Sequence, residues 1–167
     1  AIVRSEQDRT NGAWQDYLND FGTNEWINAS LVLPDGKILL IGRSDTSGQP
    51  GNDAARSVPE VTSSADITIS RHHPDGQLDT SLGIDGWLKL PLLAADEGLG
   101  ATLQADGRIL VTGRSYNADN WDLSALRMSY DGVLDTAFDG DGKLSIPLSD
   151  NDDFAYSVLS LSDGKIV

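Results

Sequence analysis

The chain contains no cysteine, one methionine and three phenylalanines, and only 12 of its 167 residues are lysine or arginine. Without cysteine it has no disulfide framework and no thiolate zinc site, so its stability must come from burial and backbone pairing. The 26 acidic residues give a net charge of −14. That charge argues against nucleic-acid binding, because phosphates are neutralised by Lys and Arg. Unbroken apolar runs are only a few residues long, which excludes a membrane span.

An internal repeat organises the sequence. Residues 34–44 (PDGKILLIGRS) recur as residues 105–115 (ADGRILVTGRS), and the motif starts again at residues 162–167 (SDGKIV). A second motif, DITISR followed by DGQLDT at residues 66–80, matches DLSALR followed by DGVLDT at residues 122–136. The underlying period is about 57 residues, and a loop about 15 residues longer than its counterpart follows the first copy of the first motif.

Each period predicts four short antiparallel strands. Asp-Gly between apolar runs is a hairpin signal, because glycine adopts positive φ without steric cost and the Asp side chain caps the turn. Alternation of apolar and polar residues marks the third strand of each unit. The expected strands are 27–33, 37–43, 66–72 and 87–90, then 99–104, 108–114, 122–129 and 143–146, and finally 155–161 with a start at 165.

Repeated four-stranded antiparallel units of this length predict an all-β fold, a β-propeller built from blades of about 57 residues. The chain divides into the end of a preceding blade at 1–23, a blade at 24–95 with an insertion at 45–65, a second full blade at 96–152, and the start of a third at 153–167. Residues 11–14 resemble the entry into a fourth strand, which is why the chain is expected to begin inside a repeat.

The Asp-Gly-Lys-Ile strand, the Asp-x-x-x-x-Arg strand and the Asp-Gly-x-Leu-Asp-Thr loop resemble the bacterial delta-60 repeat over most of residues 24–167. This resemblance implies a secreted or surface-attached bacterial protein with a propeller-like fold, and it brings no established catalytic residues. Two departures are the insertion after Ser44 and the replacement of Gly83 by Asp139 at the matching position of the second unit.

Two full units are fewer than the four to eight blades that close a propeller. The open sheet edges and apolar blade face would favour association. We therefore expect the chain to be a piece of a longer propeller, with assembly of several copies into one ring as the alternative.

The loops that join the second strand to the third, and one unit to the next, are expected at the same end of the blades. Loop variation on a fixed scaffold is how such folds acquire binding sites. Two interpretations stay open for this end: a ligand face, where carboxylates and aromatic rings bind a glycan or a Ca²⁺-bridged sugar, and acidic loops that are merely solvated. The candidate ligand-binding residues are Tyr116, Trp121, Asp96, Glu97, Asp152 and Asp153.

Asp135, Asp139 and Asp141 form a candidate metal site, because oxygen ligands at alternate positions followed by glycine suit Ca²⁺. The full twelve-residue calcium loop with a distal glutamate is missing, and the same Asp-Gly pairs also serve as turn signals. A turn without metal is therefore the competing interpretation, and no other cofactor is indicated.

The ends of neighbouring strands predict cross-strand ion pairs of Arg43 with Asp66 and of Arg114 with Asp122. His72 and His73 are the only histidines, and adjacent positions on a strand point to opposite faces, so they are not expected to share a metal.

The sequence has no Gly-x-Ser-x-Gly elbow, no His-Glu-x-x-His and no phosphate loop. The missing motifs favour a non-catalytic module with a structural or binding role, and the resemblance to the delta-60 repeat implies that this module is extracellular. The alternative is a carbohydrate-active hydrolase or lyase, since abundant carboxylates on the loop end can supply a catalytic pair.

Overall fold

The computed structural model describes residues 6–7, 14–15, 24–45 and 65–167. Its strands are β1 (Glu6–Gln7), β2 (Trp14–Gln15), β3 (Asn24–Val32), β4 (Ile38–Asp45), β5 (Ala65–His72), β6 (Trp87–Leu90), β7 (Ala95–Leu103), β8 (Ile109–Tyr116), β9 (Trp121–Met128) and β10 (Lys143–Ile146). The residues described contain no helix. Accordingly, none of them forms a helix long and apolar enough to cross a bilayer.

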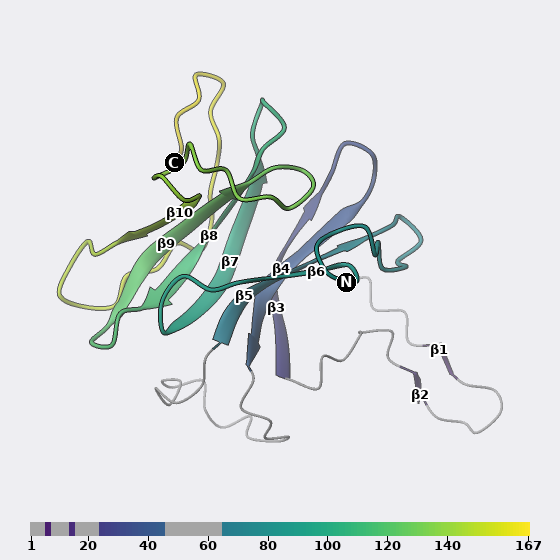
Figure 1. Ribbon diagram of the computed structural model, residues 1–167, viewed down its shortest axis with the longest axis horizontal. Helices are drawn as coiled ribbons and strands as arrows, with labels where there is room; N and C mark the ends of the chain where they lie inside the picture. The colour runs from purple at the N-terminus through teal and green to yellow at the C-terminus, as the bar shows by residue number, and fades with distance from the viewer. Residues whose placement is uncertain (1–5, 8–13, 16–23, 46–64) are drawn as a thin grey trace.

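The strands form two antiparallel four-stranded sheets, in the orders β3-β4-β5-β6 and β7-β8-β9-β10 (Figure 1). These are the two repeat units, which we call the first and second blade. The predicted all-β architecture of four-stranded blades is therefore confirmed. β1 and β2 form a separate two-stranded pair.

The first strand of each blade starts earlier than predicted, at Asn24 and at Ala95. Both strands contain a register shift, between Ile27 and Ala29 in β3 and between Gly98 and Gly100 in β7. A β-bulge of this kind interrupts the alternation of side chains, so periodicity identifies only the part of the strand beyond it.

Asp-Gly turns close the hairpins as predicted. The Asp side chain accepts a hydrogen bond from the backbone N–H two residues on, from Lys37 to Asp35 at 3.1 Å and from Arg108 to Asp106 at 3.0 Å. The glycine that follows each of these aspartates has a φ of +84° or +83°. These turns, together with those after β5 and β9, define what we call the turn end of the blades.

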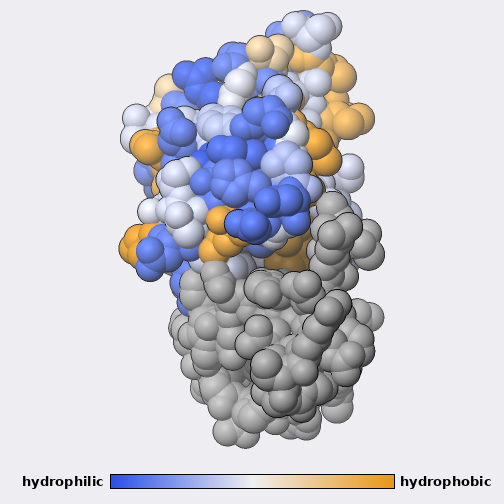
Figure 2. Space-filling model, turned by 90° about the vertical axis from the view of Figure 1, so that its right-hand side faces the viewer, coloured by the Kyte–Doolittle hydropathy of each residue, from blue (hydrophilic) through white to orange (hydrophobic). Residues whose placement is uncertain are grey.

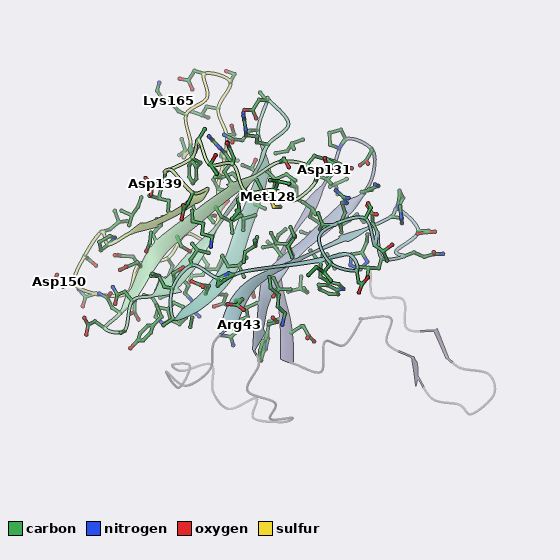
Figure 3. All side chains as sticks on the ribbon, viewed as in Figure 1. Arg43, Met128, Asp131, Asp139, Asp150 and Lys165 are labelled. Atoms are coloured by element: carbon green, nitrogen blue, oxygen red, sulfur yellow. The ribbon has the colours of Figure 1, made fainter. Side chains whose placement is uncertain are left out.

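The connections from β8 to β9 and from each blade to the next define the opposite, loop end. Figure 3 shows Asp131, Asp139 and Lys165 at the upper turn end, with Arg43 and Asp150 toward the lower loop end. The expected separation of turns from variable loops is thus present. The insertion predicted at 45–65 falls mostly outside the described residues, as does most of the segment 1–23.

The main core lies between the two blades. β7 packs against β3, β4 and β5 of the first blade. Gly98 makes this approach possible, because a Cβ there would lie 2.6 Å from Cγ2 of Ile41 and 3.3 Å from that of Ile67. The fully buried residues of this core are Leu39, Ile41, Ile67, Ile69, Leu82, Ile109, Val111, Leu126 and Met128.

The segment after the second blade forms a hairpin that packs on it. Backbone bonds join Leu159 to Val167 in both directions, at 2.8 and 2.9 Å, and the amide of Ala155 donates to the carbonyl of Gly113. Val158 is buried against Leu110 and Ala125 of the second blade. The predicted strand 155–161 is thus paired only near its end, through the bridge of Ser160 with Ile166.

Candidate functional site

A charged cluster occupies the turn end of the first blade. Arg71, near the end of β5, donates from Nε to Oδ2 of Asp79 at 2.7 Å, and Nζ of Lys37 lies 2.9 Å from the same oxygen. Ser81 donates from its hydroxyl and its amide to Oδ1 of Asp79, at 2.6 and 3.1 Å. The Ser81 hydrogen bond, followed by those of Lys37 and Arg71, holds the pKa of the Asp79 carboxyl well below its usual range. Asp79 is therefore a permanently charged structural anion at neutral pH.

The second blade completes this cluster through the turn at residues 129–133. Nη1 of Arg71 donates to the carbonyl of Tyr130 at 2.7 Å, and its guanidinium lies 4.9 Å from the centre of the Tyr130 ring. The Tyr130 hydroxyl donates to Asp35 of the first blade. Burial and this hydrogen bond raise the pKa of Tyr130 to about 12. Arg71 thus links two blades as well as two segments of one blade.

The same arrangement recurs in the second blade with substitutions. Nε of Arg127 donates to Oδ2 of Asp135 at 2.7 Å, and Nε of Arg108 lies 2.8 Å from that oxygen. Arg108 stands at the position of Lys37 in the first blade. The amide of Ala137, at the position of Ser81, donates to Oδ1 of Asp135 at 3.1 Å. The arginine and aspartate stand eight residues apart in both blades, which makes the pair a property of the repeat.

A second cluster surrounds Glu97 toward the loop end. Arg114 donates to Oε2 from Nε at 2.8 Å and lies 2.5 Å from it through Nη2, while Asn28 of the first blade donates to Oε1 at 3.1 Å. Nε of Arg43 is 3.9 Å from Oε1. One glutamate of the second blade is therefore shared by side chains from both blades.

Aromatic rings flank the arginines of this cluster. The Arg43 guanidinium lies 4.3 Å from the ring centre of Trp26. Arg114 lies 4.3 Å from Trp121 and 5.0 Å from Phe154, which precedes the C-terminal hairpin. Cation–π contacts of buried or half-buried arginines are worth about 0.5–2 kcal/mol each. The contacts with Trp26 and Trp121 join neighbouring strands within one blade, and the contact with Phe154 joins the second blade to the segment that follows it.

The predicted ligand aromatics lie within this packing. Trp121 is buried, at 4% exposure, and its ring centre is 5.4 Å from that of Tyr116. Tyr116 is half-buried and donates its hydroxyl to the carbonyl of Ala118 at 3.2 Å. Trp121 is therefore closed to solvent, whereas Tyr116 remains accessible in part.

The predicted ligand carboxylates cap the loops at this end. Asp96 is fully buried and accepts from the amides of Leu92 and Leu93 at 2.7 to 3.1 Å. Asp153 repeats this role with the amides of Leu148 and Ser149, each at 2.9 Å. Of the other two carboxylates, Glu97 accepts from Arg114 and Asp152 accepts from the amide of Trp121. The assignment of these residues to a ligand stays a prediction.

The candidate calcium ligands are not gathered around one point. Asp135 is held by two arginines, and Asp141 caps its own turn by accepting from the amide of Lys143 at 2.9 Å. Asp139 has a φ of +51°, close to the +55° of Gly83, so the substitution noted in the sequence keeps the backbone conformation. Within residues 24–45 and 65–167, no three His, Cys, Asp or Glu side chains are grouped so as to hold a metal ion.

The predicted ion pairs of Arg43 with Asp66 and of Arg114 with Asp122 do not form. Arg43 stands opposite Ile67 in the register, and Asp66 stands opposite Ser44. Directly opposed residues share a face, so each proposed pair spans two faces of the sheet. Both arginines turn to Glu97 instead.

Sequence reasoning missed Asp79, and it named Asp135 and Glu97 as candidate metal and ligand-binding residues without recognising either as a partner of arginines. The first two had a signal, because an arginine and an aspartate recur eight residues apart in both units. Glu97 had none, since Trp26 stands opposite Arg43 in the first blade as Glu97 stands opposite Arg114 in the second. His72 bonds Ser70 and the carbonyl of Gly76 through its two ring nitrogens, whereas His73 is half-buried with Nε2 4.0 Å from Oδ1 of Asp79.

Comparison with known families gives a match over part of the second blade. Residues 104–138 match a family described as a domain of unknown function (DUF5122) beta-propeller. The fold is that of β-propeller blades. The matched segment contains β8, β9 and the turn that follows, so it includes Arg127, Asp135 and Tyr130. No curated protein matches the chain.

Proposed function

We propose that the chain is a non-catalytic β-propeller module that supports a binding surface on an extracellular bacterial protein. The observation that carries this proposal is the use of its charged side chains. Ion pairs join Arg71 to Asp79 and Arg127 to Asp135, and these charged groups hold turns and blades together. Such engagement suits a scaffold, because the groups that could act on a substrate already have partners within the fold.

The proposed binding surface is the loop end. The loop between β8 and β9 and the loop after β10 are tied together, because Asn120 donates to the carbonyl of Asn151 at 3.2 Å and Asp152 accepts from the amide of Trp121 at 3.0 Å. Asn117 stiffens the first of these loops by accepting from the amides of Asp119 and Asn120. A rigid composite of two loops is a preorganised surface, which lowers the entropy lost on binding.

The ligand we propose is a glycan, bound either directly or through Ca²⁺. Support comes from the exposed polar side chains of these loops and from the resemblance to the delta-60 repeat, which implies a secreted or surface-attached protein. Figure 2 shows hydrophilic residues gathered over the side of the molecule that lies on the right in Figure 1. That side is opposite the side that carries Asp150 in Figure 3, so the proposal does not rest on that face.

One observation favours the alternative, a carbohydrate-active enzyme. Burial, with the nearby charge of Asp96 as the next cause, raises the pKa of Asp66 above its usual value. A general acid requires a carboxyl with a raised pKa and a second carboxyl group as its partner. Asp66 is the second residue of β5 and lies next to the loop end, where a glycan would lie.

A glycan array, run with and without Ca²⁺ beside a panel of chromogenic glycosides, separates the two functions. Binding without turnover supports the module. Turnover that disappears in Asp66→Asn would establish the enzyme and end the module proposal. Calorimetric titration with Ca²⁺ completes the test, since the absence of heat and of any shift in melting temperature removes the ion from the proposal.

A further inference from the structure

The two blades differ in how far their turn ends are covered. In the first blade, the Arg71 side chain is 2% exposed and Leu82 is fully buried. At the matching positions of the second blade, the Arg127 side chain is 19% exposed and Phe138 is only half-buried. We call Arg127, Phe138 and Leu144 the open patch.

The turn at residues 129–133 explains the difference. Its Tyr130 carbonyl accepts from Arg71, and Gly132 lies over the first blade so closely that a Cβ there would be 2.7 Å from Leu88 and 3.0 Å from Leu82. Gly132 has a φ of +83°, which the tight turn requires. Leu82 and Leu88 match Phe138 and Leu144 in the repeat, so the open patch has the groups that such a turn covers.

The rest of the second blade is covered in the way the first blade is. β7 packs on the first blade and supplies Glu97 next to Arg43. At the corresponding place on the second blade, the segment 153–167 supplies Phe154 to Arg114 and buries Val158. The hairpin at 155–167 therefore stands where the first two strands of a third blade would stand, while the turn-end half of the interface is unfilled.

We propose that the open patch docks the turn between the third and fourth strands of a third blade, built in the same polypeptide on the hairpin at 155–167. A backbone carbonyl of that turn accepts from Nη1 of Arg127, and a glycine two residues on lies against Phe138 and Leu144. The proposal rests on the role of the chain as a propeller module and names the partner of its exposed blade face.

The test adds a second copy of residues 111–146 after Val167, because Ile166 and Val167 match Ile109 and Leu110 in the repeat. The chain has no cysteine, so Phe138→Cys provides a single thiol whose labelling rate reports the cover of the patch. Leu82→Cys is the matched control, protected by the existing turn. We expect the extension to slow labelling of F138C by about tenfold or more, with L82C slow in both chains.

A second experiment measures how much Arg127 contributes to the melting temperature. Arg127→Ala is expected to lower the melting temperature more in the extended chain than in the original one, approaching the effect of Arg71→Ala. Equal effects of R127A in both chains, or an extension that leaves F138C as reactive as before, would overturn the proposal. So would protection of F138C in the original chain that is lost on dilution, because the occupant would then be a second copy. Glycoside turnover would end the module proposal without changing these labelling rates, so the two failures are distinguishable.

Discussion

Replacing Asp79 by asparagine removes the anion on which three side chains converge. The Arg71 and Asp79 side chains are 2% and 5% exposed, so D79N leaves the guanidinium buried with neutral partners alone, such as Ser81 and the Tyr130 carbonyl. Removing one member of a buried ion pair costs about 3–5 kcal/mol. For a chain of this size, that corresponds to a fall of about 6–20 °C in melting temperature. Urea unfolding followed by tryptophan fluorescence measures the free energy directly.

Asp75→Asn is the matched control for D79N. Asp75 is exposed and caps its turn by accepting from the amide of Gln77 at 3.0 Å, a role that asparagine also fills. We expect D75N to leave stability within about 0.5 kcal/mol of the parent. If D79N costs less than about 1 kcal/mol, or no more than D75N, the cluster does not hold the blades and the reasoning is refuted.

The pH dependence of stability gives a second test of the role of Asp79. Because the pKa of Asp79 is depressed in the folded protein, its ionised form stabilises the fold at pH values above the ordinary pKa of an aspartate, about 4. That contribution is lost as the pH falls through the folded pKa. The stability difference between the parent and D79N should thus be constant at neutral pH and shrink below about pH 4. A difference that does not change with pH would contradict the ion-pair origin.

Two further changes test the interface between the blades. Asp66→Asn should stabilise the protein at neutral pH, because burial and the charge of Asp96 raise the pKa of Asp66 in the folded protein and make its ionised form unfavourable. The gain in stability should vanish in acid, where the carboxyl is protonated. Thermal melts from pH 3 to 8 measure this, and a gain that is independent of pH, or a loss of stability, would contradict the reasoning. Gly98→Ala should cost about 1–3 kcal/mol, since the new Cβ meets Ile41 and Ile67 of the first blade, and an unchanged melting temperature would mean that the blades are not in this close contact.

The repeat and its Asp-Gly turns made most of the fold predictable from sequence. These signals are local, because an aspartate that caps the amide two residues on needs no tertiary partner, as at Asp35 and Asp106. The starts of β3 and β7 were not predictable in this way. Their bulges break the two-residue alternation, and Gly98 and Gly100 carry no side chain that could mark a face.

The side-chain partners were less predictable than the strands. Arg43 and Asp66 lie on neighbouring strands, but a one-residue offset in register puts their side chains on opposite faces of the sheet. The true partner, Glu97, lies on the next blade, and contacts between blades leave no spacing pattern in a single sequence. For the same reason, the link from Arg71 to Tyr130 emerged only from the packing of the two sheets.

The most direct test of the account is the exchange of the arginine side-chain protons, followed by NMR on the ¹⁵N-labelled chain at neutral pH. The account predicts that the Nε proton of Arg71 exchanges slowly and shows cross-peaks to the Tyr130 ring, because it is buried between the blades, whereas that of Arg127 exchanges faster. Equal, rapid exchange of both protons with no contact between Arg71 and Tyr130 would show that the two sheets do not pack as blades of one propeller.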